Sequence, residues 1–516
     1  MNSLTSLVLS SGLVLLVFAS IDKAFTNTSH PLDAIPIVGS SGLRSYWEAF
    51  KLLLTGGPAV IRRGYDLYPE GCFRIARPTH WLVIVSGPKH VKEFGDAQEH
   101  VLSFRGGMEN TIAVTQVVGR TIAEDTYHQL TIRGSLTKNL QACFDGVREE
   151  IEFAFDEVLK LQGTEWKTLK TLNAMTAVVA RVNNRLLVGL PLCRNKTYLD
   201  TSIQFAIDVI VSGQIIGFFP QYMRPFVGPL VTSRNKSIAT ALQLLGPVIE
   251  ERLAKADTLG SNWPGKPNDF ISWLLDDAVG EERTVRNLVL RVLSTNFAAI
   301  HTTSMTFTHA IFDLMTRPEL IQPLRDEAER VFEEEGWTKN ALNKMIKMDS
   351  FLRETQRLHT MGPVNMFRKV VAKDGFRFSD GTFLPEGTFA CIAIDSIHHD
   401  TSFHQNAAEL DAFRFARERE EYTATHDRDG QDMFKRHMVN AATDHLPWGI
   451  GKHVCPGRFF AAMELKTMLA HVLIKYDFEP QVPGVRPKDI VFGLSVTPNM
   501  FAKIRFRKRA NLWAWV

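Results

Sequence analysis

The chain has 516 residues, of which 45% are hydrophobic, and its formal net charge at pH 7 is +3. One large domain with a sizeable buried core fits this length and composition. The net charge is small and the one basic cluster, residues 505–509, lies near the C-terminus, so we expect no nucleic-acid partner.

The N-terminal segment is apolar. Residues 1–21 carry no charged side chain, and a helix of about 18 residues from Leu4 would span roughly 27 Å, enough for the hydrocarbon core of a bilayer. The segment predicts either a retained membrane anchor or a signal peptide, for which residues 17–19 resemble a processing site. Lys23 is the only basic residue that flanks the segment, so the positive-inside rule does not orient it.

The remaining chain reads mostly as helices. Two β-rich runs, 72–76 and 81–86, flank a turn and predict a hairpin, and Gly87-Pro88 opens a short helix. From about residue 125 the patterns are predominantly helical, and short strand-like runs return late. The clearest helical patterns are 149–162, 201–216, 237–256, 285–316 and 319–335, and the late strands lie near 376–378, 389–394 and 501–506. The predicted fold class is mainly α with a small β portion, in one catalytic domain.

The cysteines do not form a recognisable framework. They are odd in number, widely spaced and without a Cys-x-x-Cys pair, at positions Cys72, Cys143, Cys193, Cys391 and Cys455. This pattern predicts neither disulfides nor structural zinc, and it argues against secretion. We interpret the first four as buried apolar residues.

A long apolar helix contains small residues and hydroxyls at 296–304. Ala298 and Ala299 would let this helix pass close to a flat ligand, and Thr302 could hydrogen-bond a reacting group and relay protons. The alternative is that the threonine only bonds to the carbonyls of its own helix. His301 lies beside it, and a histidine that titrates near neutrality could deliver protons.

Glu354 and Arg357 are three residues apart on a helical pattern, so their side chains share a face. This spacing alone carries little information, because Glu327 and Arg330 repeat it in a more charged helix. We interpret that earlier pair as a solvated surface ion pair.

Cys455 stands in the segment 446–460, between glycines and before a new helical pattern. A thiol at a helix N-terminus is favoured as the thiolate, and Pro456 suits the first helical position. Gly451 and Gly457 let the backbone adopt conformations closed to other residues and approach a flat ligand. Such a thiolate can ligate haem iron, whereas the alternative is a free, buried cysteine.

These segments together resemble the cytochrome P-450 superfamily of haem-thiolate monooxygenases, in its fungal membrane-anchored type. The loop matches the pattern Phe-x-x-Gly-x-Arg/His-x-Cys-x-Gly at Gly451, His453, Cys455 and Gly457, with Trp448 where the family usually has Phe. The Glu354 helix lies about a hundred residues before the cysteine, as in the family. The resemblance covers essentially the whole body of the chain.

The resemblance implies haem b as cofactor, with Cys455 as metal ligand through an axial thiolate. It places His453, Arg368 and Arg133 at the haem propionates, although Gln129 stands where the family has Trp, and a surface role for Arg133 stays open. Glu354, Arg357 and Arg414 correspond to a structural triad behind the haem.

The resemblance makes Thr302 and His301 the catalytic candidates. The family usually has an acid at the position of His301, so this histidine either delivers protons or faces away from the haem while water delivers them. Substrate contacts are implied at 104–118, 297–302, 359–366 and 494–499. The apolar residues expected to line the pocket are Ile112, Val114, Val117, Val364, Met366 and Val496. Phe218, Phe219, Met223 and Phe226 would lie either in the core or at a membrane surface.

The implied function is insertion of one oxygen atom from O2 into a lipophilic small molecule, with electrons from NADPH through a separate NADPH–cytochrome P-450 reductase. Residues 1–21 would form a single-pass anchor in the endoplasmic reticulum membrane. Residues 22–45 would form a proline-containing hinge, and 46–516 a catalytic domain facing the cytosol. The rival functions are a haem-thiolate isomerase or dehydratase, which needs no oxygen-activating hydroxyl, and a catalytically silent haem-binding protein.

Overall fold

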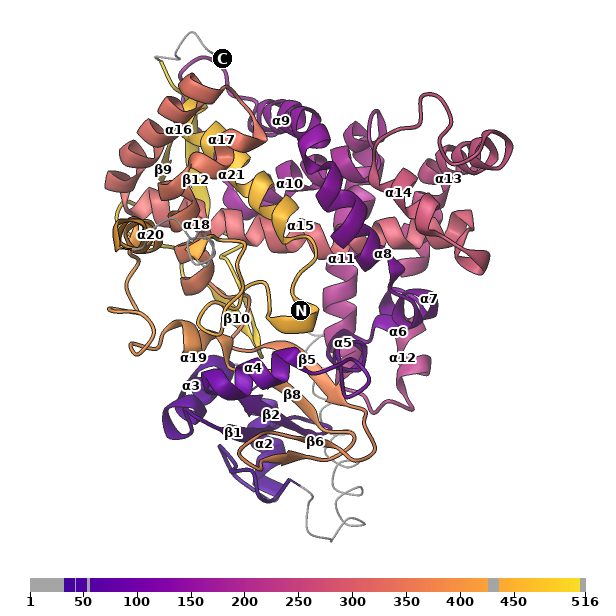
Figure 1. The fold of residues 1–516 in the computed structure, drawn as a ribbon, viewed down its shortest axis with the longest axis vertical. Helices are drawn as coiled ribbons and strands as arrows, with labels where there is room; N and C mark the ends of the chain where they lie inside the picture. The colour runs from indigo at the N-terminus through magenta and orange to yellow at the C-terminus, as the bar shows by residue number, and fades with distance from the viewer. Residues whose placement is uncertain (1–31, 42, 53–55, 426–435, 511–516) are drawn as a thin grey trace, which may run out of the picture.

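The computed structural model describes residues 32–41, 43–52, 56–425 and 436–510. The predicted anchor, 1–21, and the first part of the predicted hinge lie outside the described residues. A helical body carries the α-helices α9 to α18 and α21, and a five-stranded sheet lies at its lower end in Figure 1. The predicted fold class, mainly α with a small β portion, is confirmed.

The helices follow one another in this order: α2 (Leu43–Lys51), α3 (Gly57–Leu67), α4 (Pro88–Asp96), α5 (Phe104–Ile112), α6 (Val114–Val117), α7 (Arg120–Glu124), α8 (Tyr127–Thr131), α9 (Thr137–Leu159), α10 (Thr171–Leu187), α11 (Lys196–Gly217), α12 (Arg224–Val231), α13 (Arg234–Leu259), α14 (Phe270–Asp277), α15 (Val285–Thr316), α16 (Ile321–Glu335), α17 (Lys339–Lys344), α18 (Ile346–Leu358), α19 (Ile394–His398), α20 (Arg414–Thr425) and α21 (Arg458–Lys475). A π-helical turn, Ile132–Leu136, joins α8 to α9, and a short 3-10 turn, Gly451–His453, precedes α21.

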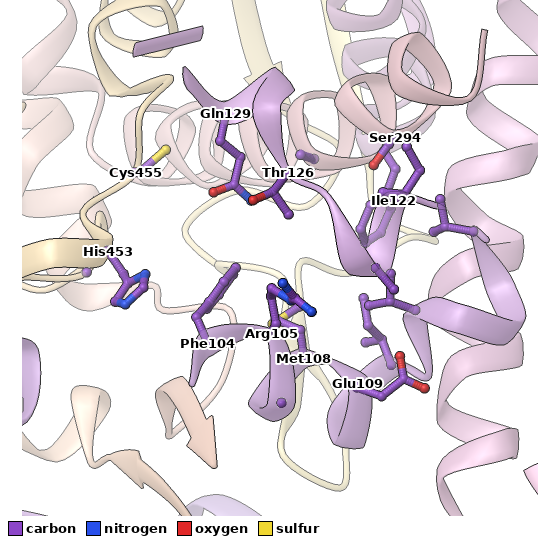
Figure 2. Close-up of a pocket in the computed structure, with 18 of the residues that line it drawn as sticks. Phe104, Arg105, Met108, Glu109, Ile122, Thr126, Gln129, Ser294, His453 and Cys455 are labelled. Carbon is purple, nitrogen blue, oxygen red and sulfur yellow. The ribbon is translucent and has the colours of Figure 1, made fainter. Parts of the chain in front are cut away.

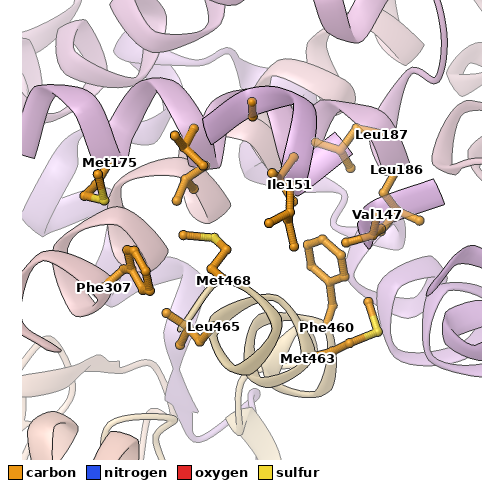
Figure 3. Packing of buried hydrophobic residues seen from close by; sticks show 14 of the residues in the cluster. Val147, Ile151, Met175, Leu186, Leu187, Phe307, Phe460, Met463, Leu465 and Met468 are labelled. Carbon is orange, nitrogen blue, oxygen red and sulfur yellow. The ribbon is translucent and has the colours of Figure 1, made fainter. Parts of the chain in front are cut away.

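The main core lies where α9, α10, α15 and α21 meet. Figure 3 shows side chains from all four helices directed into one apolar layer, including Ile151, Met175, Phe307 and Met468. Each of these four side chains is at most 1% exposed. Because α21 follows Cys455 directly, this packing fixes the end of the loop that carries the thiol.

The largest sheet has the strand order β1-β2-β8-β5-β3. Its β1 and β2 form an antiparallel hairpin, β2 runs parallel to β8, and β5 runs antiparallel to both β8 and β3. The strands of this sheet are β1 (Cys72–Ala76), β2 (Trp81–Val85), β3 (Leu102–Ser103), β5 (Asn365–Val370) and β8 (Phe389–Ile392). The smaller sheets pair β4 (Lys167–Lys170) and β9 (Tyr476–Pro480) with β12 (Lys503–Lys508), β6 (Phe376–Arg377) with β7 (Phe383–Leu384), and β10 (Ile490–Phe492) with β11 (Ser495–Thr497).

The described part of the predicted hinge packs against this sheet. Ile37 forms a parallel bridge with Arg74, and the backbone N–H of Arg74 donates to the carbonyl of Pro36. Ile35 and Val38 are buried in the same apolar cluster as β1 and β2. This stretch therefore extends the sheet, and its proline lies beside β1.

The predicted helices and strands agree with the structure where the sequence carries strong local signals, such as a turn or a helix cap. The hairpin is confirmed, and the helix predicted over 285–316 is confirmed at both ends as α15. Its start is capped by Thr284, whose hydroxyl accepts from the N–H of Asn287, and Pro318 follows its end. The sequence patterns did not predict α10 or β5, although both line the cavity described below.

Among the described helices, α11 is the one long and apolar enough to cross a bilayer by length and composition. One of its faces, with Phe205 and Val209, is buried in the core, and α11 packs against α15 and α13. The helix is therefore apolar mainly because it belongs to the core. It also carries exposed apolar residues, among them Ile207 and Val211.

Candidate active site

A large cavity lies between the helical body and the sheet, with a volume of about 1450 Å³. Figure 2 shows Cys455 and His453 entering it from the loop before α21, with Phe104, Arg105 and Met108 of α5 on another side. Segments far apart in the sequence form its walls: α5, the α8 region, α10, α15, β5 and the cysteine loop. Every haem-site candidate except His301 and the structural triad lines this cavity.

The cysteine loop turns sharply because of two glycines. Gly449 and Gly451 have φ values of 72° and 69°, in the left-handed region that favours glycine. A Cβ on Gly451 would lie 2.1 Å from the carbonyl oxygen of Gly95 in α4, so no side chain fits there. Gly457, by contrast, has φ −86°, so the prediction of an unusual backbone conformation at Gly457 was wrong.

The thiol of Cys455 lies just before the N-terminus of α21. The helix begins at Arg458 with Gly457 as N-cap, so the prediction that Pro456 occupies the first helical position was wrong. Burial raises the pKa of the thiol, whereas the backbone N–H groups of Gly457 and Arg458 and the Arg458 charge lower it. The N–H groups at this helix start are thus directed at the sulfur, which favours an anion.

The cysteine loop accommodates the indole ring of Trp448, which is larger than the Phe that the family usually has there. Its indole N–H donates to the carbonyl of Met438 at 2.5 Å, and its side chain lines the cavity. The tryptophan therefore satisfies its polar atom outside the cavity and presents a flat apolar surface to it.

Two arginines and one histidine that are candidate haem contacts, Arg133, Arg368 and His453, line the cavity. Arg368 is 2% exposed, and among the described residues its guanidinium donates to the carbonyl of Phe367 and lies over the ring of Phe104. Burial lowers the pKa of Arg368 to about 10, opposed by Glu99. Burial also lowers the pKa of His453, to which the charges of Arg368 and Arg133 contribute.

Arg368 reaches the cavity because β5 is irregular. The register of β5 against β8 shifts between Asn365 and Arg368, and Met366 has φ 59°. A bulge of this kind re-aims side chains, and a non-glycine residue at positive φ is strained. Asn365, Met366 and Arg368 all line the cavity as a result.

The α15 wall carries Ala298, Ala299, Thr302 and Thr303. The hydroxyl of Thr302 donates to the carbonyl of Ala298 at 2.9 Å, so it bonds to its own helix and is also exposed to the cavity. The functional and the structural interpretation of this threonine are thus compatible, because a hydroxyl that donates to a carbonyl still has acceptor capacity.

His301 is not among the residues that line the cavity. Its Nε2 is buried without a hydrogen-bond partner among the described residues, and burial lowers its pKa. The side chain therefore lies on a different face of α15 from that of Thr302, outside the cavity, because consecutive residues of a helix point about 100° apart.

Glu354, Arg357 and Arg414 do come together. Arg357 donates to both carboxylate oxygens of Glu354, at 2.7 and 2.8 Å, and Nε of Arg414 donates to the same carboxylate at 3.2 Å. Glu354 and Arg357 are fully buried. His398 accepts the N–H of Leu446 and bonds to the carbonyl of Arg357, which ties the triad to the cysteine loop.

The interpretation of Glu327 and Arg330 as an ion pair was wrong. Glu327 is 7% exposed and accepts the backbone N–H groups of Lys347 and Met348 at the start of α18. Arg330 pairs instead with Glu334 at the surface. The carboxylate of Glu327 thus caps a helix, a role that spacing within one helix does not reveal.

The predicted substrate segments line the cavity only in part. Residues of 104–118 and 297–302 line it extensively, and 359–366 contributes Asn365 and Met366, whereas 494–499 does not reach it. Of the predicted apolar residues, Ile112, Val114 and Met366 line the cavity, and the others do not. Sequence reasoning missed Asn183, Leu186 and Leu187 of α10, because the apolar periodicity of that helix was not identified.

The chain resembles known proteins over almost its full length. The family model of cytochrome P450 matches residues 47–503. Cytochrome P450 monooxygenase 151 of Postia placenta is 35% identical over 93% of this chain and 95% of its own length, and monooxygenase 103 of the same fungus is 34% identical over 96% and 98%. Cytochrome P450 monooxygenase CYP512U6 of Ganoderma lucidum is 35% identical over 89% of this chain and 88% of its own. The chain belongs to the cytochrome P450 family and is a monooxygenase whose cofactor is haem iron.

Proposed function

We propose that this monooxygenase uses Cys455 as the axial thiolate ligand of haem b and inserts one oxygen atom from O2 into a lipophilic small molecule. The observation that carries this proposal is the common cavity of Cys455, the α15 residues Ala298 and Thr302, and the cations Arg368 and Arg133. A thiolate-ligated haem supplies oxygen activation, because thiolate donation favours cleavage of the O–O bond.

The residues present fit a haem. Arg368 is almost fully buried at the wall, and most of its N–H groups have no partner among the described residues. An anionic group inside the cavity, such as a propionate, would pair with them. Arg133 and His453 offer further donors nearby, and Ala298 and Ala299 leave room beside α15 for a flat ring.

Each residue then has a defined task. The N–H groups of Gly457 and Arg458 oppose the effect of burial on the pKa of the Cys455 thiol and would stabilise its thiolate as the ligand of the iron. The Glu354–Arg357–Arg414 triad and His398 hold the loop in place from behind. Thr302 is the hydroxyl from which protons enter the reaction, and water in the cavity supplies them. His301 takes no direct part, because its side chain lies outside the cavity.

The substrate class follows from the size and lining of the cavity. Ligand pockets usually measure roughly 300–1,000 Å³. At about 1450 Å³ the cavity holds a planar cofactor and leaves space for a further molecule. The lining around that space is largely apolar, with Met108, Ile112, Val114 and Phe297, so a lipophilic substrate suits it.

Electrons are proposed to come from NADPH through a separate cytochrome P-450 reductase. A second hollow on the outer side of the cysteine loop is lined by Arg133, Lys452 and Arg458, with Phe459 beside them. A cationic surface directly behind Cys455 would attract an acidic partner and shorten the path for an electron. Lys452→Glu should slow reduction of the haem by the reductase, and Lys236→Glu, an exposed lysine on α13, should not.

The protein is proposed to lie on the endoplasmic reticulum membrane, with residues 1–21 as a single-pass anchor, 22–45 as hinge and 46–516 as a catalytic domain facing the cytosol. The side chains of Phe226 and Leu230 on α12 are 77% and 85% exposed. Tyr222, just before α12, is 66% exposed. An exposed apolar group of this kind suits an interface with lipid. Deletion of residues 1–21 should move the protein from the membrane fraction toward the soluble fraction, and retention in full would contradict the anchor.

The test of the activity is expression with a fungal reductase and a panel of lipophilic compounds. A product that gains one atom from isotopically labelled dioxygen, only when NADPH and reductase are present, supports the proposal. Conversion of a hydroperoxide without NADPH would identify an isomerase or dehydratase instead. Haem binding with no substrate-dependent NADPH consumption across the panel would favour the silent haem-binding protein.

A further inference from the structure

Arg224 is a buried cation that the proposed function does not use. It is the first residue of α12, it is 4% exposed and it lines the cavity. Its guanidinium donates to the carbonyls of Phe219 and Glu109, at 3.1 and 3.0 Å, and to the amide oxygen of Asn110 at 3.4 Å. These acceptors are all neutral, so among the described residues no carboxylate forms an ion pair with this arginine.

The guanidinium of Arg224 has unused donors. Of the five N–H groups of an arginine, these bonds engage three, which leaves one N–H on each terminal nitrogen without a partner in the part of the chain that the structure describes. A carboxylate can accept N–H groups from both terminal nitrogens at once. Burial lowers the pKa of Arg224, opposed by Glu109, because a buried charge without a counter-ion is costly. A bound anion would remove this cost.

The neighbouring side chains do not neutralise the site. The carboxylate of Glu109 accepts the N–H and the hydroxyl of Thr115, both at 2.9 Å, and so acts on the arginine only at longer range. His80 also lines the cavity, and burial together with Arg77 and Arg224 lowers its pKa to about 3, so its ring is neutral. Two arginines and one carboxylate thus act on this part of the wall, and one positive charge is left over.

Arg224 binds the end of α5 that is farther from the cysteine loop. At the start of α5 the ring of Phe104 lies against that of His453, with centroids 5.7 Å apart, whereas Arg224 bonds to Glu109 and Asn110. Figure 2 shows Phe104 beside His453 and Glu109 farther along the helix. A helix rises about 1.5 Å per residue, so Asn110 lies roughly 9 Å along the axis from Phe104. An anion at Arg224 would leave the space toward the cysteine loop to the apolar part of the same molecule.

We propose that Arg224 binds a carboxylate of the substrate, so that the lipophilic molecule oxidised by this enzyme carries an acidic group remote from the carbon that reacts. This inference rests on the proposed function, whose substrate class it narrows to lipophilic carboxylic acids. A singly charged carboxylate suits the site better than a doubly charged phosphate, because the negative charge of Glu109 acts on the same place and would repel a second charge.

The test measures binding by titration calorimetry, which needs neither reductase nor oxygen. The probes are dodecanoic, pyrenebutyric and dehydroabietic acids, each with its methyl ester, added to the haem protein at neutral pH. At least one acid should bind the wild type roughly 10–100 times more tightly than its ester, as for a hydrogen bond to a charged group. Arg224→Gln should bring that acid and its ester to similar affinity. A panel in which no acid binds more tightly than its ester would overturn the proposal.

Two other arginines serve as controls. Arg234 is a half-buried arginine at the start of α13 that also donates to a carbonyl, that of Thr115 at 3.0 Å, but it is not among the residues that line the cavity. Arg234→Gln should keep the acid preference. Arg105 is exposed and is directed into the cavity in Figure 2, so Arg105→Gln tests a solvated cation. An acid preference that survives Arg224→Gln but is lost in Arg105→Gln would overturn the proposal.

Arg224→Lys covers the case in which Arg224→Gln does not fold. A lysine keeps the charge but lacks the fork of a guanidinium, so the acid preference should fall below that of the wild type while the acid still binds better than its ester. An acid preference equal to that of the wild type would overturn the contact of the guanidinium with both oxygens.

This inference and the proposed function can fail separately. If the wild type has no thiolate-type carbon monoxide spectrum, the proposed function fails, yet calorimetry still reports whether Arg224 binds a carboxylate. If the spectrum and the incorporation of labelled oxygen are both found but no acid is preferred over its ester, the inference fails and the proposed function stands.

Discussion

The backbone N–H of Cys455 donates to the carbonyl oxygen of Trp448 at 2.8 Å. This bond closes the loop over Gly449 and Gly451, so the thiol is directed into the cavity by a turn and not by a long flexible segment. Trp448 is in turn fixed through its indole N–H to Met438. The position of the sulfur therefore depends on the tryptophan as well as on the glycines.

Trp448→Phe should weaken the loop without removing the haem. The carbonyl of Met438, a residue that is 0% exposed, loses its indole donor, which costs about 1–3 kcal/mol. Thermal unfolding of the haem protein should shift downward, and the carbon monoxide spectrum should keep its position. Trp273→Phe is the matched control, since it removes the bond from the indole N–H of Trp273 on α14 to Asn268, and it should leave the rate of haem loss unchanged.

Glu354→Ala should prevent accumulation of folded haem protein. It leaves the guanidinium groups of Arg357 and Arg414 buried without their carboxylate, which costs about 3–5 kcal/mol. Arg330→Ala breaks a pair whose side chains are 58% and 52% exposed, and its effect should stay within about 0.5 kcal/mol. Denaturant unfolding and the haem content per protein should be measured for both variants, Glu354→Ala and Arg330→Ala. Equal stability of the two variants would refute the scaffold role of the triad.

Arg368→Met should loosen the haem. A hydrogen bond to a charged group is worth about 1.5–3 kcal/mol, so haem should transfer to an excess acceptor protein roughly 10–100 times faster than from the wild type. Arg377→Met is the control, because that arginine lies in β6 and bonds to Gly381 at the surface. Similar transfer rates for both variants would show that Arg368 does not hold a propionate.

Acid should destabilise the protein through its buried, neutral histidines. Burial lowers the pKa of His471 to about 3, with smaller effects of Lys475 and Arg148. A folded pKa below the unfolded value near 6.5 means that the unfolded state takes up the proton first, so this stability is complete above pH 6.5 and is lost as the pH falls.

His471→Phe tests this sign. The ring packs in a tilted arrangement against Phe155 with centroids 5.2 Å apart, so phenylalanine keeps the packing and removes the titrating group. Relative to the wild type, the free energy of unfolding of the variant should gain about 2 kcal/mol between pH 7 and pH 5. A difference that does not depend on pH, or that grows toward alkaline pH, would be the contrary result.

Local signals explain what the sequence predicts correctly. A threonine cap and a following proline set the ends of α15, and the glycines with Cys455 mark the loop. Contacts between distant segments explain what it misses. The bulge of β5 aims Arg368, the face of α15 leaves His301 outside the cavity, and Glu327 caps a helix from another element. None of these follows from residue spacing, because each is decided by the partner against which the element packs.

The most direct measurement of the ligand assignment is the spectrum of the reduced, carbon monoxide-bound protein in the wild type and in Cys455→His, with Cys391→Ser as a control for a buried cysteine elsewhere. The wild type and Cys391→Ser should show the long-wavelength Soret band of a thiolate-ligated haem, and Cys455→His should lose it. A thiolate-type band that persists in Cys455→His would contradict the account.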